Sequence, residues 1–384
     1  MNKGFFDILF SNNGNTLLLY TLLIVFSSLF AWRAQPERYY GTLRVNKGWF
    51  GLSFLTLCFF CAFADVGEDT EWYKEHFINM NSFSKCGFGP VELGFQYYNV
   101  FLHFITKNPI TYIIISRVLM VALVFWGIYM MREKSVLWLA VLGFSCVVYF
   151  QMFSALRNGL AYSSGFLAYA FCVKNKNVLA LIIAILGISI HRSMAFFVIA
   201  IILYLYIIKT PFAKLKKQST FILLMVALLI YYYGTTVFGY VLASDDALMR
   251  KYDDYMEGKG TSGYMAFFVY LPLAYVFANF GRPKNIDANY YLLNVYLSII
   301  GFVFALLAYQ VGQLTRVAPY FSLPFLFFMG FYVQTGLKEN RKHASSLYFF
   351  VFLIVLYWLY RYSLFVSGLF FANGLNDYKF FTFS

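Results

Sequence analysis

Long apolar runs, each close to twenty residues, are the feature that most constrains this chain. A longer run, residues 178–208, holds His191 and Arg192 near its centre and is otherwise almost free of polar residues. A helix of about 20 apolar residues is long enough to cross a bilayer. Only 12% of the residues are charged, against about 25% in a soluble domain. The pattern predicts an all-α fold, a polytopic bundle of membrane helices. The alternating ten-residue segments of a membrane β-barrel are absent.

About 12 membrane helices are expected from these runs. The chain reads as a single integral membrane domain, 1–384, with two large outer loops at 65–109 and 242–263. Within the first loop, Glu92 to Ile105 fits a short helix that lies at the membrane interface. The expected spans are near 17–32, 48–64, 110–131, 136–153, 158–173, 178–191, 194–208, 219–241, 264–280, 290–309, 317–335 and 346–366. The segments on either side of His191 are short, either two helices that meet at a break or one interrupted helix.

Loop charges predict which side each loop occupies. Lysine and arginine residues cluster in alternate loops, and such loops usually lie on the cytoplasmic side. Two of the other loops hold ten of the acidic residues, Asp65, Glu68, Asp69, Glu71, Glu75, Asp245, Asp246, Asp253, Asp254 and Glu257. This pattern places 65–109, 242–263 and both termini outside. Because the net charge of +13 is spread over these short loops, we expect no nucleic-acid partner. The cytoplasmic cations are Arg33, Arg38, Arg44, Lys47, Arg132, Lys134, Lys174, Lys176, Lys209, Lys214, Lys216, Lys217, Arg282, Lys284, Lys338, Arg341 and Lys342.

Five arginines do not follow the charge rule, because this topology places them at or near the outer ends of spans. A guanidinium group stays charged when partly buried and binds phosphate oxygens in pairs. A shared anion site at this depth suggests a lipid-linked phosphate or diphosphate. No Walker motif occurs, so energy from ATP is not expected. The candidates for diphosphate binding are Arg117, Arg157, Arg192, Arg316 and Arg361.

Three residues are candidates for a catalytic base at the same side. Asp69 lies where the second span leaves the membrane, Glu92 lies later in the same loop, and His191 lies at the break between the two short segments. Each could accept a proton from a reacting hydroxyl. The four histidines show no metal-ligand spacing, and Cys58-x-x-Cys61 lies inside an apolar span, so we expect neither a metal nor another cofactor.

The order of these elements resembles the EpsG-like group of Wzy-type polysaccharide polymerases, which includes O-antigen polymerases. The resemblance covers roughly residues 17–335. It rests on Asp69 with Tyr73, the Glu92-x-Gly-Phe element, LRNGLAYSSG, ISIHRSMAFF and TRVAPYF. Two departures stand out: Asn158 replaces the glutamine that commonly follows the arginine of LRNG, and Arg192 replaces an aromatic residue after the histidine.

The resemblance implies a GT-C-like variant fold in the bacterial inner membrane. The enzyme would transfer a glycan from undecaprenyl diphosphate onto the non-reducing end of a lipid-linked repeat unit, at the periplasmic face. Arg157 and Arg316, then Arg192, would hold the departing diphosphate, while Asn158 and Tyr73 would bind substrate. Partners would be the lipid-linked oligosaccharide, membrane lipid and a chain-length regulator protein.

Three other functions fit part of the pattern. A flippase for lipid-linked oligosaccharides would share the outer arginines but should also show charges along a path from the cytoplasm, often with internal symmetry. A ligase would move finished glycan to another acceptor. A membrane acyltransferase would use His191 as its base and would need a cytoplasmic opening for its acyl donor.

Overall fold

The computed structural model describes residues 14–35, 37–39, 42–87, 91–211, 214, 281–310, 317–339, 344–366, 375 and 378–382. These residues are helical apart from a short antiparallel hairpin, β1 (Glu37–Tyr39) and β2 (Thr42–Arg44). The chain divides into two units, one formed by 1–195, 326–331 and 351–384, and the other by 196–325 and 332–350. Each unit is described by itself.

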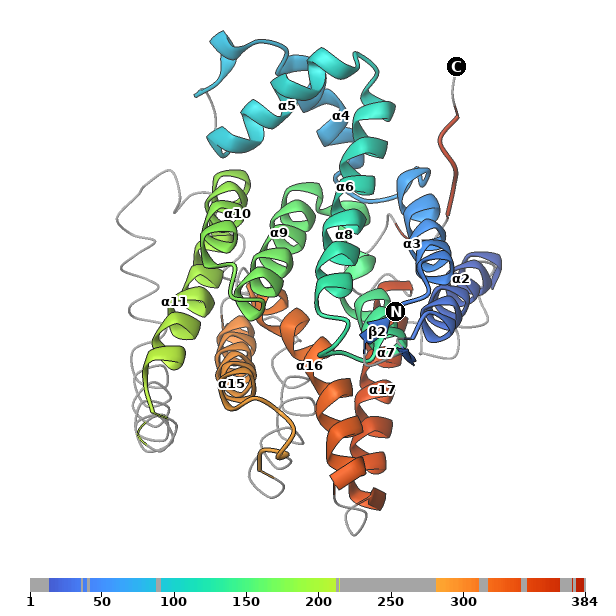
Figure 1. The fold of residues 1–384 in the computed structure, drawn as a ribbon. Helices are drawn as coiled ribbons and strands as arrows, with labels where there is room; N and C mark the ends of the chain where they lie inside the picture. Colours follow the sequence, from blue (N-terminus) through green and yellow to red (C-terminus); the bar gives the residue numbers. More distant parts are fainter. Residues whose placement is uncertain are drawn as a thin grey trace. The chain divides into compact units, whose positions relative to one another are not determined.

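In the first unit, α9 is packed between α6 and α10, and α3 is packed between α2 and α6 (Figure 1). A π-helical segment, Ser145–Tyr149, joins α7 to α8, so the three form one nearly continuous stretch. The helices are α2 (Gly14–Arg33), α3 (Lys47–Ala62), α4 (Thr70–Asn79), α5 (Leu93–Ile105), α6 (Pro109–Met130), α7 (Leu137–Phe144), α8 (Gln151–Ser154), α9 (Leu156–Val173) and α10 (Asn177–Ile190).

Local sequence explains where several of these helices begin and end. The side chains of Asn46 and Asn108 accept hydrogen bonds from backbone N–H groups in the first turns of α3 and α6. Such caps satisfy donors that a helix start leaves without partners, and Pro109 at the first turn of α6 suits a position that needs no N–H donor. At its C-terminal end, α10 stops at Ile190 because the backbone of His191 is extended, with φ −152° and ψ 121°. A 3₁₀ turn, Arg192–Met194, follows.

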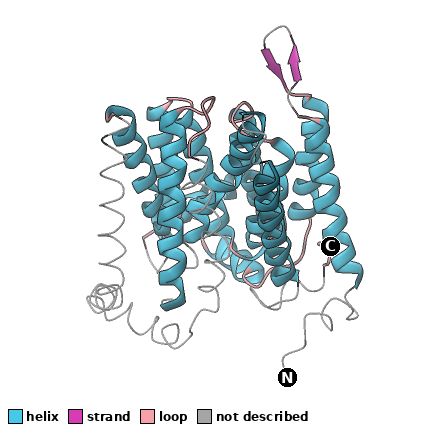
Figure 2. Cartoon of the chain, turned by 90° about the horizontal axis from the view of Figure 1, so that it is seen from below, coloured by secondary structure: helices cyan, strands magenta, loops and turns pink. Residues whose placement is uncertain are grey.

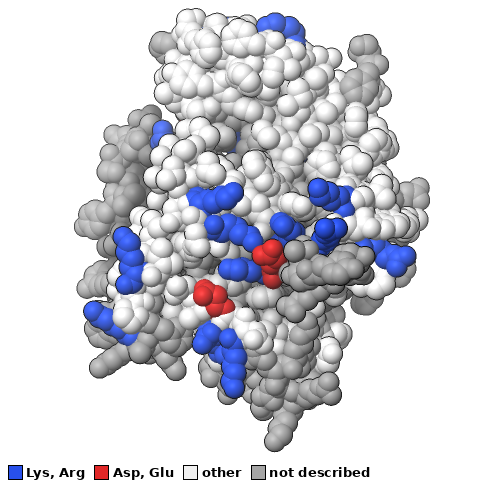
Figure 3. Space-filling view, in the orientation of Figure 1, with Lys and Arg blue, Asp and Glu red and all other residues white. Residues whose placement is uncertain are grey.

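The loops rich in lysine and arginine meet at one end of the first unit, here called the basic end. The backbone N–H of Leu137 donates to Oε1 of Gln35 at 3.0 Å, and Lys174 pairs with Glu133 at 3.0 Å. These contacts join the loops after α2, α6 and α9, as the charge pattern predicts. Figure 2 shows the β hairpin beyond the helix ends. Many Lys and Arg side chains and few acidic ones are visible on the face drawn in Figure 3.

The opposite end of the unit carries α4 and α5, which lie together in Figure 1. A segment from the end of the described chain also lies here: the N–H of Asp65 donates to the carbonyl of Lys379 at 2.7 Å, and that of Phe381 to Phe63 at 3.0 Å. Ala64 and Phe380 form the intervening β-bridge. The connection between α3 and α4 is therefore paired with residues 379–381.

Helix α5 has its polar and apolar sides reversed relative to a helix in water. Gln96, Asn99 and His103 are buried against the protein. The exposed side is apolar: Leu93, Tyr97, Phe101, Phe104 and Ile105 are between 46% and 74% exposed. We call these five residues the outer stripe of α5. An apolar surface of this kind is suited to contact with lipid.

The second unit contains α11 (Ala195–Lys209), α15 (Ala288–Gln310) and parts of α16 (Ala318–Glu339) and α17 (Ala344–Val366). Its aromatic packing includes the stacked rings of Phe304 and Phe321, with centroids 5.3 Å apart. The hydroxyl of Tyr332 donates to the carbonyl of Gly281 at 2.6 Å. The remainder of α16 and α17 belongs to the first unit, where Phe327 stacks on Phe166 and Trp358 packs against Gly143.

The all-α prediction agrees with the described residues, and ten of the expected spans coincide with helical segments to within a few residues. Among the residues that the structure describes, three helices are long and apolar enough to cross a membrane, Thr16–Arg33, Pro109–Met130 and Arg192–Lys209, and five shorter apolar helices accompany them. The structure is that of a helical membrane protein. The expected spans 219–241 and 264–280 and the loop 242–263 lie outside the described residues, so the number of about 12 spans stays a prediction.

Candidate functional site

Glu92 is the centre of a cluster of polar residues at the end opposite the basic end. Its Oε2 atom accepts a hydrogen bond from Nη1 of Arg157 at 2.8 Å. Its Oε1 atom accepts one from the backbone N–H of Arg192 at 3.2 Å and lies 3.1 Å from Nδ1 of His191. This Nδ1 atom is buried, and its geometry toward the described residues is not that of a hydrogen bond. Three segments far apart in sequence thus meet at one carboxylate.

The fold brings Glu92 to this position through a close approach of α5 to α10. Glu92 precedes the first residue of α5 and does not use its side chain as a cap. Two residues later, a Cβ atom at Gly94 would overlap the side chain and backbone of Ser189. Only glycine allows the two helices to come this near, two residues before His191. The Glu92-x-Gly-Phe element of the sequence therefore combines a candidate site carboxylate with the glycine that allows the close approach of α5 to α10.

The charge of Glu92 is stabilised by its neighbours. Burial alone would raise the pKa of this carboxyl group, but the interaction with His191 and the charge of Arg157 lower the pKa to about 2. Glu92 is therefore a carboxylate at neutral pH. Because a base works best when its pKa is near the working pH, a carboxylate with so low a pKa is a weak proton acceptor.

Tyr73 and Asn158 adjoin the cluster, on α4 and α9. The buried hydroxyl of Tyr73 accepts a hydrogen bond from the backbone N–H of Arg157 at 3.4 Å. Burial raises the pKa of this hydroxyl, and the nearby charges of Arg157 and Asp69 act in opposite directions. Asn158 is 6% exposed, and its Oδ1 atom has no hydrogen-bond partner among the described residues. Asp69 is exposed at the start of α4, one turn before Tyr73.

Aromatic rings surround the Arg157 guanidinium. Its central carbon lies 5.7 Å from the ring of Trp72 and 6.0 Å from that of Phe95. Trp72 stacks on His76 at 4.9 Å, and His76 faces Phe95 at 6.0 Å. The sequence patterns did not indicate Trp72, His76 or Phe95 as parts of one site. Their helical spacing on α4, at positions 72 and 76, is the signal that could have done so.

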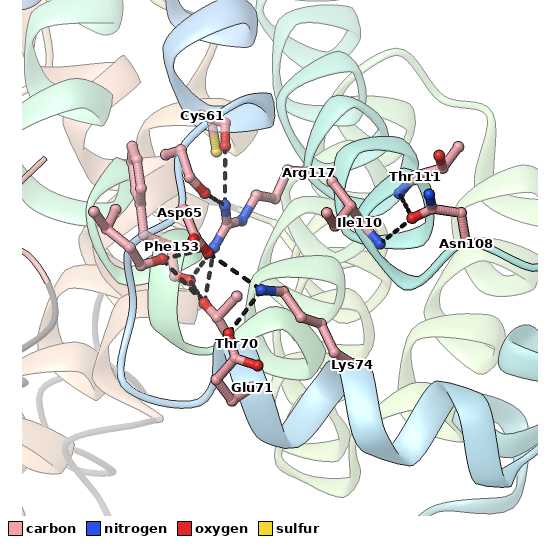
Figure 4. A network of polar contacts seen from close by, with 12 residues as sticks. Cys61, Asp65, Thr70, Glu71, Lys74, Asn108, Ile110, Thr111, Arg117 and Phe153 are labelled. Atoms are coloured by element: carbon pink, nitrogen blue, oxygen red, sulfur yellow. Dashed lines mark hydrogen bonds and ion pairs between the residues drawn. The ribbon is translucent and has the colours of Figure 1, made fainter. Parts of the chain in front are cut away.

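Arg117 has a different environment from Arg157 (Figure 4). Its side chain is 1% exposed, and its guanidinium donates to four backbone carbonyls and to the Thr70 hydroxyl. The carbonyls belong to Cys61, Ala64, Val66 and Phe153, at the end of α3, the loop after it and the end of α8. With its donors directed at protein carbonyls, Arg117 is a structural residue in this arrangement. We therefore leave it out of the proposed diphosphate site.

The remaining predicted arginines do not meet in the described residues. Arg192 touches Glu92 through its backbone, while its side chain is exposed. Arg361 is half-buried in α17, and no described contact joins it to Glu92, Arg157 or His191. Arg316 lies outside the described residues. The structure thus brings together Tyr73, Glu92, Arg157, Asn158 and His191, with the backbone of Arg192.

No group of three metal-binding side chains occurs in the part of the chain that the structure describes. Glu92 and His191 offer two ligand atoms, and Arg157 is paired with the other oxygen of the same carboxylate. A cation beside these residues would repel a metal ion, since like charges close together are unfavourable.

Comparison with known protein families gives one match. The sequence profile of the EpsG family matches residues 47–380, most of the chain. The chain belongs to the EpsG family. This family includes Wzy-like polymerases, so the resemblance seen in the sequence is confirmed. No curated protein and no solved structure matches the chain. Within the EpsG match lie Glu92, Arg157 and His191, the three residues whose contacts define the candidate site.

Proposed function

We propose that this protein is a polysaccharide polymerase, a glycosyltransferase that uses a sugar chain linked to undecaprenyl diphosphate. Membership of the EpsG family supports a polymerase-like glycosyltransferase. The observation that carries the proposal further is the Arg157–Glu92–His191 cluster, which combines a cation for a diphosphate with a carboxylate-bound histidine. The reaction would take place at the periplasmic face of the bacterial inner membrane.

In the proposed reaction, a hydroxyl of the acceptor sugar attacks the anomeric carbon of the donor. The bond from that carbon to the diphosphate oxygen breaks, and undecaprenyl diphosphate leaves with the bonding electrons. Negative charge that develops on the leaving group requires fixed donors. Arg157 is the first of these, with Arg192 and Arg316 as further cations. Its guanidinium has five N–H donors, and its buried Nε atom has no described partner.

His191 is the proposed base that takes the acceptor proton. Nδ1 of His191 lies 3.1 Å from Oε1 of Glu92, so a proton on Nδ1 would face the carboxylate and Nε2 would be free to accept the proton of the acceptor hydroxyl. A carboxylate that orients histidine in this way is a recurrent catalytic arrangement. Glu92 is better suited to orienting His191 and Arg157 than to accepting the proton itself, because its pKa is low. Asp69, exposed near Tyr73, is the alternative base.

Several buried polar atoms around the cluster support a polar ligand. Oδ1 of Asn158, Nε of Arg157 and Nε2 of His76 all lack a hydrogen-bond partner among the described residues. Buried polar atoms are usually paired, so atoms that are not often mark a place where water or ligand binds. A sugar–diphosphate substrate offers both the acceptors and the hydroxyl donors that these atoms need.

Replacing His191 with asparagine or Glu92 with glutamine tests these roles. Loss of a general base or of the residue that orients it lowers rates by about 10²–10⁴-fold. We expect losses in this range, measured with purified protein in liposomes and with lipid-linked repeat units from a polymerase-deficient host, as polymer length over time. Glu133→Gln, at the basic end, is the matched control and should retain activity. Normal rates in both site variants would contradict the assignment.

We also propose that α5 lies in the outer leaflet, with its outer stripe against lipid chains, so that Glu92 is near the phosphate level. Single cysteines at Phe101 and Phe104, labelled with a fluorophore in a background without exposed cysteine, should be quenched by lipids that carry a spin label. A label at Glu75, exposed on α4, should be quenched by iodide in water instead. Quenching of the α5 labels by iodide alone would exclude this placement.

A further inference from the structure

We propose that Trp72 is a platform for a sugar ring, held beside the candidate site by His76 and Phe95. This inference rests on the proposed function, because it assigns a subsite to the glycan of the same substrate. The platform is defined by the open part of the Trp72 indole, which is 43% exposed although tryptophan is large and apolar.

The surroundings of Trp72 separate it from residues that face lipid. Four exposed residues on and before α4 are acidic, Glu68, Asp69, Glu71 and Glu75, and the exposed apolar Ile78 lies nearer the end of the helix. A surface with this many charges lies in water, since charges in hydrocarbon are costly. The outer stripe of α5 is the opposite case, an exposed surface made only of apolar side chains. An exposed tryptophan among carboxylates is suited to a ligand that has both apolar and hydroxyl surfaces.

The ring of Trp72 is fixed before any ligand binds. It lies nearly parallel to the His76 ring, with an interplanar angle of 7° and centroids 4.9 Å apart. His76 in turn is parallel to Phe95 within 14°, and Tyr73 meets Trp72 edge-on at 5.0 Å. Because the ring is already held in place, binding a ligand to it costs little conformational entropy. Burial and the charge of Arg157 lower the pKa of His76, so the middle ring of the stack is neutral.

The chemistry of a sugar ring matches this surface and its position. The C–H groups on one face of a pyranose are weakly positive, and the face of an indole is negative. The hydroxyl groups around the ring can donate to the carboxylates beside Trp72. Arg157 connects the platform to the reaction, since its guanidinium lies 5.7 Å from the Trp72 ring and is bonded to Glu92. A sugar on Trp72 would therefore adjoin the diphosphate-binding residue.

Binding measurements on purified protein can test the platform without turnover. The probes are the oligosaccharide repeat unit, released from the lipid-linked pool of the host by mild acid, and farnesyl diphosphate, which carries no sugar. We expect Trp72→Leu to weaken oligosaccharide binding about tenfold, equivalent to about 1.4 kcal/mol, and Trp72→Phe to weaken it less. Farnesyl diphosphate should bind both variants as it binds the unmodified protein. Trp126→Leu, at a tryptophan that is 53% exposed on α6, is the matched control.

Unchanged oligosaccharide affinity in Trp72→Leu would overturn the platform, and so would failure of the unmodified protein to bind the oligosaccharide. Neither result decides the proposed function, which is tested separately by polymer formation in liposomes. A protein that binds the oligosaccharide through Trp72 and yet forms no polymer would support the platform and contradict the polymerase. Thermal unfolding of each variant shows whether the fold is intact.

Discussion

Polymer formation should fall by at least about 100-fold when Arg157 is replaced with alanine, because a donor that meets developing charge contributes about this much or more to a rate. Arg157 is the only described arginine side chain that contacts Glu92. Lysine at this position keeps the charge but cannot form a planar pair of hydrogen bonds, so Arg157→Lys should recover only part of the activity. The measurement is the rate of chain growth in liposomes at saturating lipid-linked substrate.

Two controls separate chemistry from folding in this experiment. Lys174→Ala removes the cation of the Lys174–Glu133 ion pair at the basic end and should leave chain growth intact. The double variant Arg157→Met with Glu92→Gln removes both charges of the site pair, so that no buried charge is left without a partner. It should be as stable as the parent and still inactive. Chain growth at the parent rate in Arg157→Ala would refute the diphosphate role.

Replacement of Arg117 with methionine should instead destabilise the fold. The four carbonyls that accept from this side chain would lose their donor inside the protein, and each such loss costs about 1–3 kcal/mol. We expect a loss of at least about 3 kcal/mol in the free energy of unfolding, or failure to accumulate folded protein. Thermal unfolding in detergent, followed by intrinsic fluorescence, measures the change.

Arg117→Lys distinguishes a general need for charge from the need for several directed donors. An ammonium group has three donors on a flexible stem, against five in a fixed plane for guanidinium. We expect the free energy of unfolding of Arg117→Lys to lie between that of the parent protein and that of Arg117→Met. Arg132→Met is the control, since that side chain donates to a single carbonyl, that of Tyr129, near the surface. If Arg117→Met is as stable as the parent and only inactive, Arg117 belongs in the site after all.

The sequence was informative wherever one physical signal dominated. The length of the apolar runs predicted the described spans, and the alternation of charged loops predicted that Lys174 and Arg132 lie at the same end of the bundle. Both signals depend only on local amino-acid composition, which can be read directly from the sequence. The meeting of Glu92 with His191 could only be expected from a family pattern, since 100 residues separate Glu92 from Arg192. Arg117 and Arg157 could not be told apart, because burial and partners decide whether a guanidinium serves the fold or a ligand. The Trp72–His76–Phe95 stack depends on the packing of α4 against α5.

The pairing of residues 379–381 with the connection after α3 has a consequence for how the protein is made. Tyr378 hydrogen-bonds to Phe60 across 318 positions in the chain, and Lys379 supplies the acceptor for Asp65. A ribosome must therefore add every intervening helix before these bonds can form. Until then, the segment that leads into α4 stays without these partners, so this face of the molecule closes only after α17 has been synthesised.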